Sequence, residues 1–160
     1  MAGWGKRGGA WILVAAAGCG YGFTAGKARM PAGAERIYVL PFANHTSDAE
    51  VGVLVTAALR EELARRGSAG GTDSPARIEG TVARILFGAA TPEASTYRLY
   101  MDVQARLLVD GKVVGEQTAH RQQDYLGEVD AIASEGRRRL ALRQAASDAA
   151  REIVERFETP

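Results

Sequence analysis

Residues 97–109 constrain the fold most, because apolar and polar side chains alternate there along the whole segment. The apolar side chains are those of Tyr97, Leu99, Met101, Val103, Ala105, Leu107 and Val109. A period of two is typical of a strand with one buried face and one face in water. Asp110 and Gly111 follow directly and favour the positive φ angles of a two-residue hairpin turn. We therefore predict a return strand from Lys112 to about Asp124.

Two further segments have the spacing of amphipathic helices. One should begin at Ser47, which with Glu50 fits a capping box, and end at Gly67, a suitable terminator; its apolar stripe lies within residues 51–63. The other is in the tail and begins between Asp130 and Arg137. Its apolar stripe is Leu142, Ala145, Ala146, Ala149, Ile153 and Phe157. Glu152 and Arg156 are spaced to pair along it.

Two more strands complete the domain. Residues 36–42 are rich in β-branched and aromatic side chains, and residues 77–87 follow the first helix, with Gly80 at a possible bulge and Gly88 at the end. The order β-α-β-β-β-α predicts an α+β fold over residues 34–158. Both helices should cover one face of a four-stranded, mainly antiparallel sheet. The other face is then polar and open, and carries Arg98, Tyr100, Asp102, Gln104 and Arg106.

Residues 1–18 have the three parts of an export signal, which are basic Lys6 and Arg7, the short apolar run 10–17, and small residues before Cys19. The run is too short to cross a bilayer as a helix. We expect the signal to be cleaved and residues 19–33, rich in glycine and alanine, to form a tether.

The sequence Ala16-Ala17-Gly18-Cys19 resembles the lipobox of bacterial lipoproteins, with alanine at Ala16 where leucine is usual. The resemblance implies cleavage before Cys19, a diacylglycerol thioether on its sulfur and a further acyl chain such as palmitate on its amine. Gly20 after the cysteine favours the outer membrane. The alternatives are an ordinary signal cleaved elsewhere and a buried free thiol.

Residue types argue against catalysis and against nucleic-acid binding. The net charge is +1, whereas general nucleic-acid binders carry a strong basic excess. His45 and His120 lie in separate segments, without carboxylate or cysteine companions at the spacing of metal ligands. Asp102 and Glu116 could be neighbours across two strands, which we interpret as surface charges. We expect no enzyme, no metal and no cofactor besides the lipid on Cys19.

Basic side chains offer two places for contact with phosphate. A cluster in the tail is better explained as a solvated helix end; it consists of Arg137, Arg138, Arg139 and Arg143. Arg98 and Arg106 are the better candidates, because they share the open strand face with Tyr100 and Gln104.

In order and spacing, the segments together resemble LptE, the lipopolysaccharide-assembly lipoprotein family, over essentially the whole mature chain. The segments concerned are residues 18–23, 37–46, 58–63, 65–67, 78–82 and 97–99. The resemblance implies two helices on a four-stranded sheet. It also implies an outer-membrane lipoprotein on the periplasmic side that plugs the β-barrel translocon LptD, supports its assembly and binds lipopolysaccharide. Arg98 and Arg106 are then candidate lipopolysaccharide contacts, chosen by face and charge.

A rival interpretation remains open. Residues 39–44 also resemble the first strand of lipoprotein activators of cell-wall synthases and of secretion-channel lipoproteins. Such a protein would be a periplasm-facing binding module with a different partner.

Overall fold

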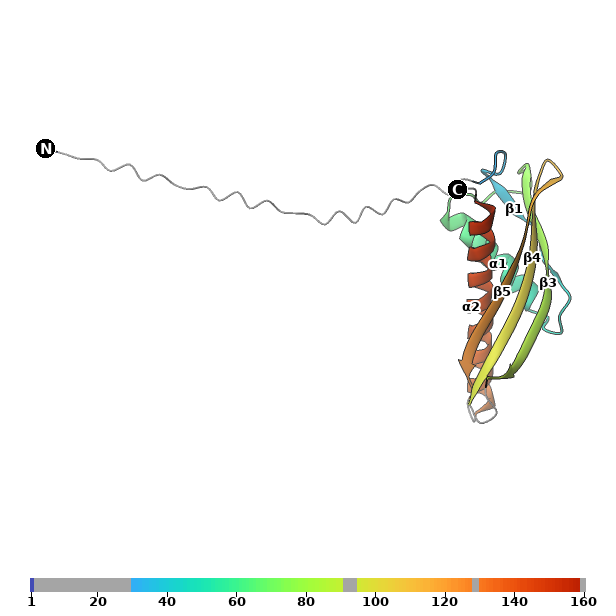
Figure 1. Ribbon diagram of the computed structural model, residues 1–160, viewed down its shortest axis with the longest axis vertical. Helices are drawn as coiled ribbons and strands as arrows, with labels where there is room; N and C mark the ends of the chain where they lie inside the picture. The colour runs from blue at the N-terminus through green and yellow to red at the C-terminus, as the bar shows by residue number, and fades with distance from the viewer. Residues whose placement is uncertain (2–29, 91–94, 128–129, 159–160) are drawn as a thin grey trace.

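The structure is a computed structural model that describes Met1 and residues 30–90, 95–127 and 130–158. Its elements are β1 (Ile37–Val39), β2 (Ala43–Asn44), α1 (Val51–Arg65), β3 (Ala76–Ala89), β4 (Thr96–Val109), β5 (Lys112–Leu126) and α2 (Ala131–Phe157). One long, curved sheet forms one layer, and the two helices pack against it as the second (Figure 1). This confirms the predicted α+β fold.

The sheet combines an antiparallel meander with a parallel edge. Strands β3, β4 and β5 pair antiparallel, in that order, and the hairpin at Asp110 and Gly111 joins the last two. The φ angles of these two residues are 50° and 77°, as the hairpin prediction requires. β1 and β2 both pair in parallel with β3, with Ile37 opposite Ala76 and Ala43 opposite Thr81.

The first predicted strand, residues 36–42, is interrupted. Val39 lies opposite Ile78 and Ala43 opposite Thr81, so this edge has one residue more than β3 between the two pairs. Pro41 lies in the interruption, where the absence of its N–H breaks no ladder bond. Phe42 turns inward and is buried, and its backbone N–H donates to the hydroxyl of Thr56 on α1.

Two register shifts set the faces of the meander. One lies between Val82 and Arg84, so the bulge predicted at Gly80 is wrong by about three residues. Gly80 has another role, because a Cβ there would lie 2.1 Å from the Gln104 carbonyl oxygen and 2.5 Å from the Phe42 ring. Gly88 does not end the strand, which continues to Ala89. The second shift leaves Val114 unpaired, since Leu108 opposes Val113 but Leu107 opposes Gly115.

The core lies between the sheet and the helices. From β4 it receives five of the seven predicted residues: Leu99, Met101, Val103, Ala105 and Leu107. Tyr97, which is 41% exposed, and half-buried Val109 lie outside it. From α2 it receives Leu142, Ala145, Ala146, Ala149, Ile153 and Phe157, the stripe identified in the sequence. Burial of this apolar surface is the main force that holds the two layers together.

Helix α1 begins at Val51, but the predicted capping box is wrong. Glu50 is the N-cap and makes no side-chain capping bond, while its backbone N–H donates to the Asp48 carboxylate. Asp48 therefore takes the place predicted for Ser47. The end of the helix is as predicted, because Gly67 has a φ of 74° and its N–H donates to the Ala64 carbonyl.

Helix α2 begins at Ala131, at the early limit of the predicted range, with the Asp130 carboxylate accepting from the N–H of Ile132. Its buried residues begin only at Ala141. The predicted ion pair of Glu152 with Arg156 is present. Among the described residues, no helix is both long and apolar enough to cross a membrane.

Candidate functional site

The face of the sheet turned away from the helices is polar, and we call it the open face. It is formed by alternate residues of β3, β4 and β5, and the registers place them in rows. Its polar residues, together with Tyr100, are Glu79, Thr81, Arg84, Arg98, Asp102, Gln104, Arg106, Glu116, Thr118, His120, Gln122 and Asp124, and exposed Leu86 lies on the same face opposite Tyr100. The five residues predicted for this face from β4 all lie on it.

Asp102 is the centre of the middle row. Its two carboxylate oxygens contact Arg84 Nε at 2.7 Å and His120 Nδ1 at 2.7 Å, one from each neighbouring strand. Partial burial favours the neutral acid, but the hydrogen bonds from His120 and Arg84 outweigh it and lower the pKa of Asp102. The predicted proximity of Asp102 to Glu116 is wrong, because Asp102 lies opposite His120 and Glu116 lies opposite Arg106.

Arg98 lies toward the distal end of the open face, the end remote from the Asp110–Gly111 hairpin. Its Nε and Nη2 donate to the two oxygens of Asp124 on β5 at 2.7 and 2.8 Å. This two-point contact is the strongest geometry available to an arginine and a carboxylate. It raises the pKa of Arg98 above its ordinary value and lowers that of Asp124.

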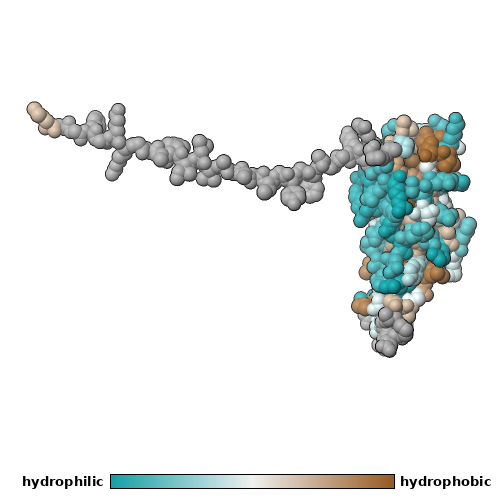
Figure 2. Space-filling model, viewed as in Figure 1, coloured by the Kyte–Doolittle hydropathy of each residue, from teal (hydrophilic) through white to brown (hydrophobic). Residues whose placement is uncertain are grey.

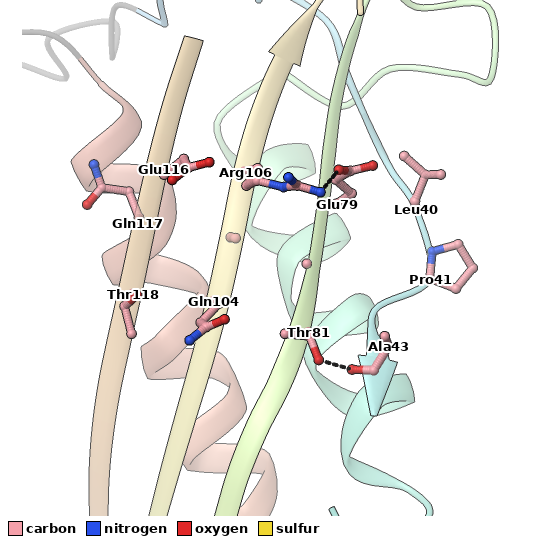
Figure 3. Close-up of a pocket in the computed structure, with 12 residues that line it drawn as sticks. Leu40, Pro41, Ala43, Glu79, Thr81, Gln104, Arg106, Glu116, Gln117 and Thr118 are labelled. Carbon is pink, nitrogen blue, oxygen red and sulfur yellow. Dashed lines mark hydrogen bonds and ion pairs between the residues drawn. The ribbon is translucent and has the colours of Figure 1, made fainter. Parts of the chain in front are cut away.

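Arg106 lies toward the hairpin end, between two carboxylates. It extends toward Glu79 on β3 and donates to it, and Glu116 stands beside it on β5 (Figure 3). Farther along the same face, Thr81 donates to the backbone carbonyl of Ala43 at 3.2 Å. The edge strand is thereby fixed to the polar face.

These residues line an open hollow of about 760 Å³ on the sheet surface (Figure 3). Leu40 and Pro41 form its apolar rim at the β1–β2 edge. The floor and the far side are polar: Glu79, Thr81, Gln104, Arg106, Glu116, Gln117 and Thr118. The hollow offers many hydrogen-bonding groups, and its ionised side chains are one cation and two carboxylates.

The two candidate contacts for lipopolysaccharide lie on one face but are far apart. At about 3.3 Å per residue along β4, the Cα atoms of Arg98 and Arg106 are separated by roughly 26 Å. Each is already paired with a carboxylate of a neighbouring strand. They do not form one basic pocket, so each can meet only a separate part of an anionic ligand.

The arginines of the tail are divided among different contacts. Arg138 donates to Glu135 and to Asp48, and its guanidinium lies 5.2 Å from the centre of the Phe87 ring. Arg139 also donates to Glu135. Hydrogen bonds from Arg138, and to a smaller extent from Arg139, hold the pKa of Glu135 at about 2. Arg138 therefore joins α2 to β3 and to the turn before α1.

Cys19, the predicted lipidation site, lies outside the described residues, as do the predicted signal and most of the tether. Within the described residues, no group of three or more His, Cys, Asp and Glu side chains is arranged to hold a metal ion. His45 lies in the turn after β2, whereas His120 lies on β5.

The sequence did not reveal the partners of Arg98 and Arg106, or the ion pairs around Asp102. The partners that β5 supplies depend on the bulge at Val114. Without it, the hairpin register would pair Asp102 with Ala119 and Met101 with His120, and His120 would then point toward the core. The sequence feature that comes closest to indicating this bulge is the pair of adjacent valines at 113 and 114, which interrupts the alternation of apolar and polar residues in β5.

Comparisons with known proteins identify the family from one match and the fold from several. A family model described as LptE: Lipopolysaccharide-assembly matches residues 34–157. A search of curated proteins found no match. A Caulobacter crescentus CB15 structure assigned as a lipoprotein shares 21% identity over 78% of this chain and 89% of its own, with a TM-score of 0.60.

Two other solved structures have the same fold. The PelC dodecamer of Paraburkholderia phytofirmans has a TM-score of 0.59 at 15% identity, over 82% of this chain and 95% of its own. The rare lipoprotein B of Shewanella oneidensis has a TM-score of 0.50 at 17% identity, over 74% of this chain and 92% of its own. At these identities the likeness concerns the fold alone.

Proposed function

Since the chain belongs to the LptE lipopolysaccharide-assembly family, we propose that it is an outer-membrane lipoprotein that occupies and supports the β-barrel translocon LptD. In this role it would bind lipopolysaccharide on its way to the outer leaflet. Its attachment would be through lipid on Cys19, on the periplasmic side of the membrane. Several acyl chains on one cysteine would make that attachment stable.

The observation that carries the proposal is the polarity of the open face. The core side chains of the sheet are enclosed beneath the two helices, and the opposite face presents rows of charged and amide groups. The domain is also long and narrow (Figure 1). The interior of a large membrane β-barrel is polar, so a slender domain with a polar sheet surface is suited to it.

Arg98 and Arg106 are the proposed lipopolysaccharide contacts. Arginine binds phosphate and carboxylate groups through parallel hydrogen bonds, and both residues present guanidinium groups on the open face. Their carboxylate partners would be exchanged for the ligand's anionic groups. Such an exchange costs little when both groups remain in water, because exposed ion pairs are weak.

The test is affinity purification of the full-length tagged protein from detergent-solubilised membranes at high salt. The expected result is a large β-barrel protein in stoichiometric amount, with lipopolysaccharide in the same complex. A Cys19→Ser variant tests the anchor separately, since in the absence of the barrel protein it should leave the membrane fraction while keeping its fold. Recovery of a cell-wall synthase or a secretion channel in place of the barrel would contradict the proposal and favour the rival interpretation.

A further inference from the structure

The hairpin between β4 and β5 exposes apolar side chains that an ordinary strand would bury. Val113 and Val114 are adjacent, and each is 48% exposed. Successive side chains of a regular strand point to opposite faces, so one of the two would normally enter the core. The register shift opposite Leu107 and Leu108 prevents this, because Val114 has no partner on β4. In Figure 2, hydrophobic residues gather at this upper end of the molecule.

The chain enters the domain at the same end. The last residues of the predicted tether and Ala34 form a turn, in which the N–H of Ala34 donates to the carbonyl of Pro31. Gly33 in that turn has a φ of 85°, and a Cβ on it would lie 2.8 Å from Val109 Cγ1, at the end of β4. The turn is therefore packed against the base of the hairpin. Figure 1 shows β1, which follows this turn, and the hairpin at the same end of the sheet.

The length of the tether limits how far this end can lie from a membrane. If Cys19 carries the lipid, only residues 20–29 separate it from Met30. At most about 3.6 Å per residue, the connection spans no more than about 40 Å even when fully extended. A domain held this close to a surface has a high effective concentration there, so a weak contact is enough to orient it.

We propose that Val113 and Val114 rest in the headgroup region of the bilayer that holds the lipidated Cys19. The contact orients the domain with its hairpin end on the membrane and the start of α2 farthest from it. Lys112, next to the valines and exposed, adds a cation where anionic headgroups attract it. This inference rests on the proposed lipid anchor and concerns the lipoprotein on the membrane before it occupies the proposed barrel partner.

The experiment uses the full-length lipoprotein in vesicles of phosphatidylethanolamine and phosphatidylglycerol, without any barrel protein. An environment-sensitive fluorophore is attached at Val114→Cys, while the thioether-blocked Cys19 does not react. The matched control is Val53→Cys, which replaces another exposed valine, 72% exposed in the first turn of α1. We expect a quencher carried on the lipid headgroups to quench the fluorophore at position 114 several-fold more than at 53.

Equal quenching at the two positions would overturn the inference. Hydrogen exchange of the unlabelled lipoprotein gives a second measurement, with residues 108–116 exchanging more slowly in vesicles than in detergent. Flotation of the protein with the vesicles reports the anchor separately. If the protein does not float, the lipid anchor is absent and the inference fails. If no barrel protein is recovered in the affinity purification, only the proposed function fails.

Discussion

Arg98 and Asp124 meet across β4 and β5 through two parallel hydrogen bonds, Nε to Oδ1 at 2.7 Å and Nη2 to Oδ2 at 2.8 Å. An anionic ligand that uses Arg98 must compete with this carboxylate. The strength of ligand binding should therefore respond in opposite directions to changes at the two residues.

Asp124→Asn should strengthen binding of lipopolysaccharide several-fold, because it frees Arg98 from its ion pair, and Arg98→Gln should weaken it. Binding is measured with purified protein and fluorescent lipopolysaccharide at low and moderate salt. Arg151→Gln is the control, since this exposed arginine lies on α2, outside the open face. If Arg98→Gln binds as tightly as the unsubstituted protein, Arg98 is not a lipid contact.

Glu135 should make a pH-dependent contribution to stability. Its pKa is lowered from 4.5 to about 2 by Arg138, and Arg139 adds to the effect. Because the pKa is depressed in the folded state, the stabilisation is present above pH 4.5 and is lost as the pH falls toward 2. Glu135→Gln should lower the Tm by about 2 °C at pH 7, and the difference should vanish near pH 2. The measurement is thermal unfolding followed by circular dichroism.

The control for this experiment is Glu61→Gln, an exposed carboxylate of α1 for which the described residues provide no cation partner. This variant should have nearly the same Tm as the unsubstituted protein at every pH in the experiment. A Tm difference for Glu135→Gln that stays constant from neutral pH down to the pKa of about 2 would contradict the assigned ion pairs.

Gly80 should be intolerant of any side chain. A Cβ at this position would lie 2.1 Å from the backbone oxygen of Gln104 and 2.5 Å from the ring of buried Phe42. Gly80→Ala should therefore destabilise the protein by about 1–3 kcal/mol through overpacking. Gly88→Ala, in the same strand with nothing within 4 Å, should change stability by less than about 0.5 kcal/mol. Urea unfolding of the two variants gives the comparison, and equal midpoints would contradict this packing.

Leu107 and Leu86 test the assignment of the two faces. Leu107 is fully buried on β4, whereas Leu86 is 50% exposed on the open face opposite Tyr100. Leu107→Ala should cost about 2–5 kcal/mol of unfolding free energy, and Leu86→Ala should cost less than about 1 kcal/mol. Chemical denaturation measures both values. A similar loss in the two variants would mean that the open face is covered by another part of the protein.

The strand 97–109 could be predicted because a single periodic pattern determines both its conformation and its faces. From Leu99 to Leu107 the buried and polar side chains lie where the alternation places them, whereas Tyr97 at the start is exposed and Val109 at the end is half-buried. The turn at Asp110 and Gly111 was equally clear, since few residue pairs adopt two positive φ angles in succession. The apolar stripe of α2 identified its buried face for the same reason.

Other features depend on contacts between distant segments and leave little local signal. The bulges after Val82 and at Val114 decide which side chains of β3 and β5 reach the open face. They therefore decide that Arg84 and His120 flank Asp102. Several side chains near Asp48 could accept the N–H of Glu50 before helix α1, and only the structure shows that Asp48 does so. The partners of Arg98 and Arg106 followed from the same registers and could not be foreseen.

The parallel pairing of β1 with β3 has a consequence for the order of folding. Strands β3, β4 and β5 are neighbours in sequence and can pair progressively from the turns that join them. Ile37, by contrast, pairs with Ala76, and the whole of α1 lies in the loop that this contact closes. Closing such a loop costs chain entropy before any contact compensates for it, which slows its formation. The segment of the domain that leaves the ribosome first is thus the last to join the sheet.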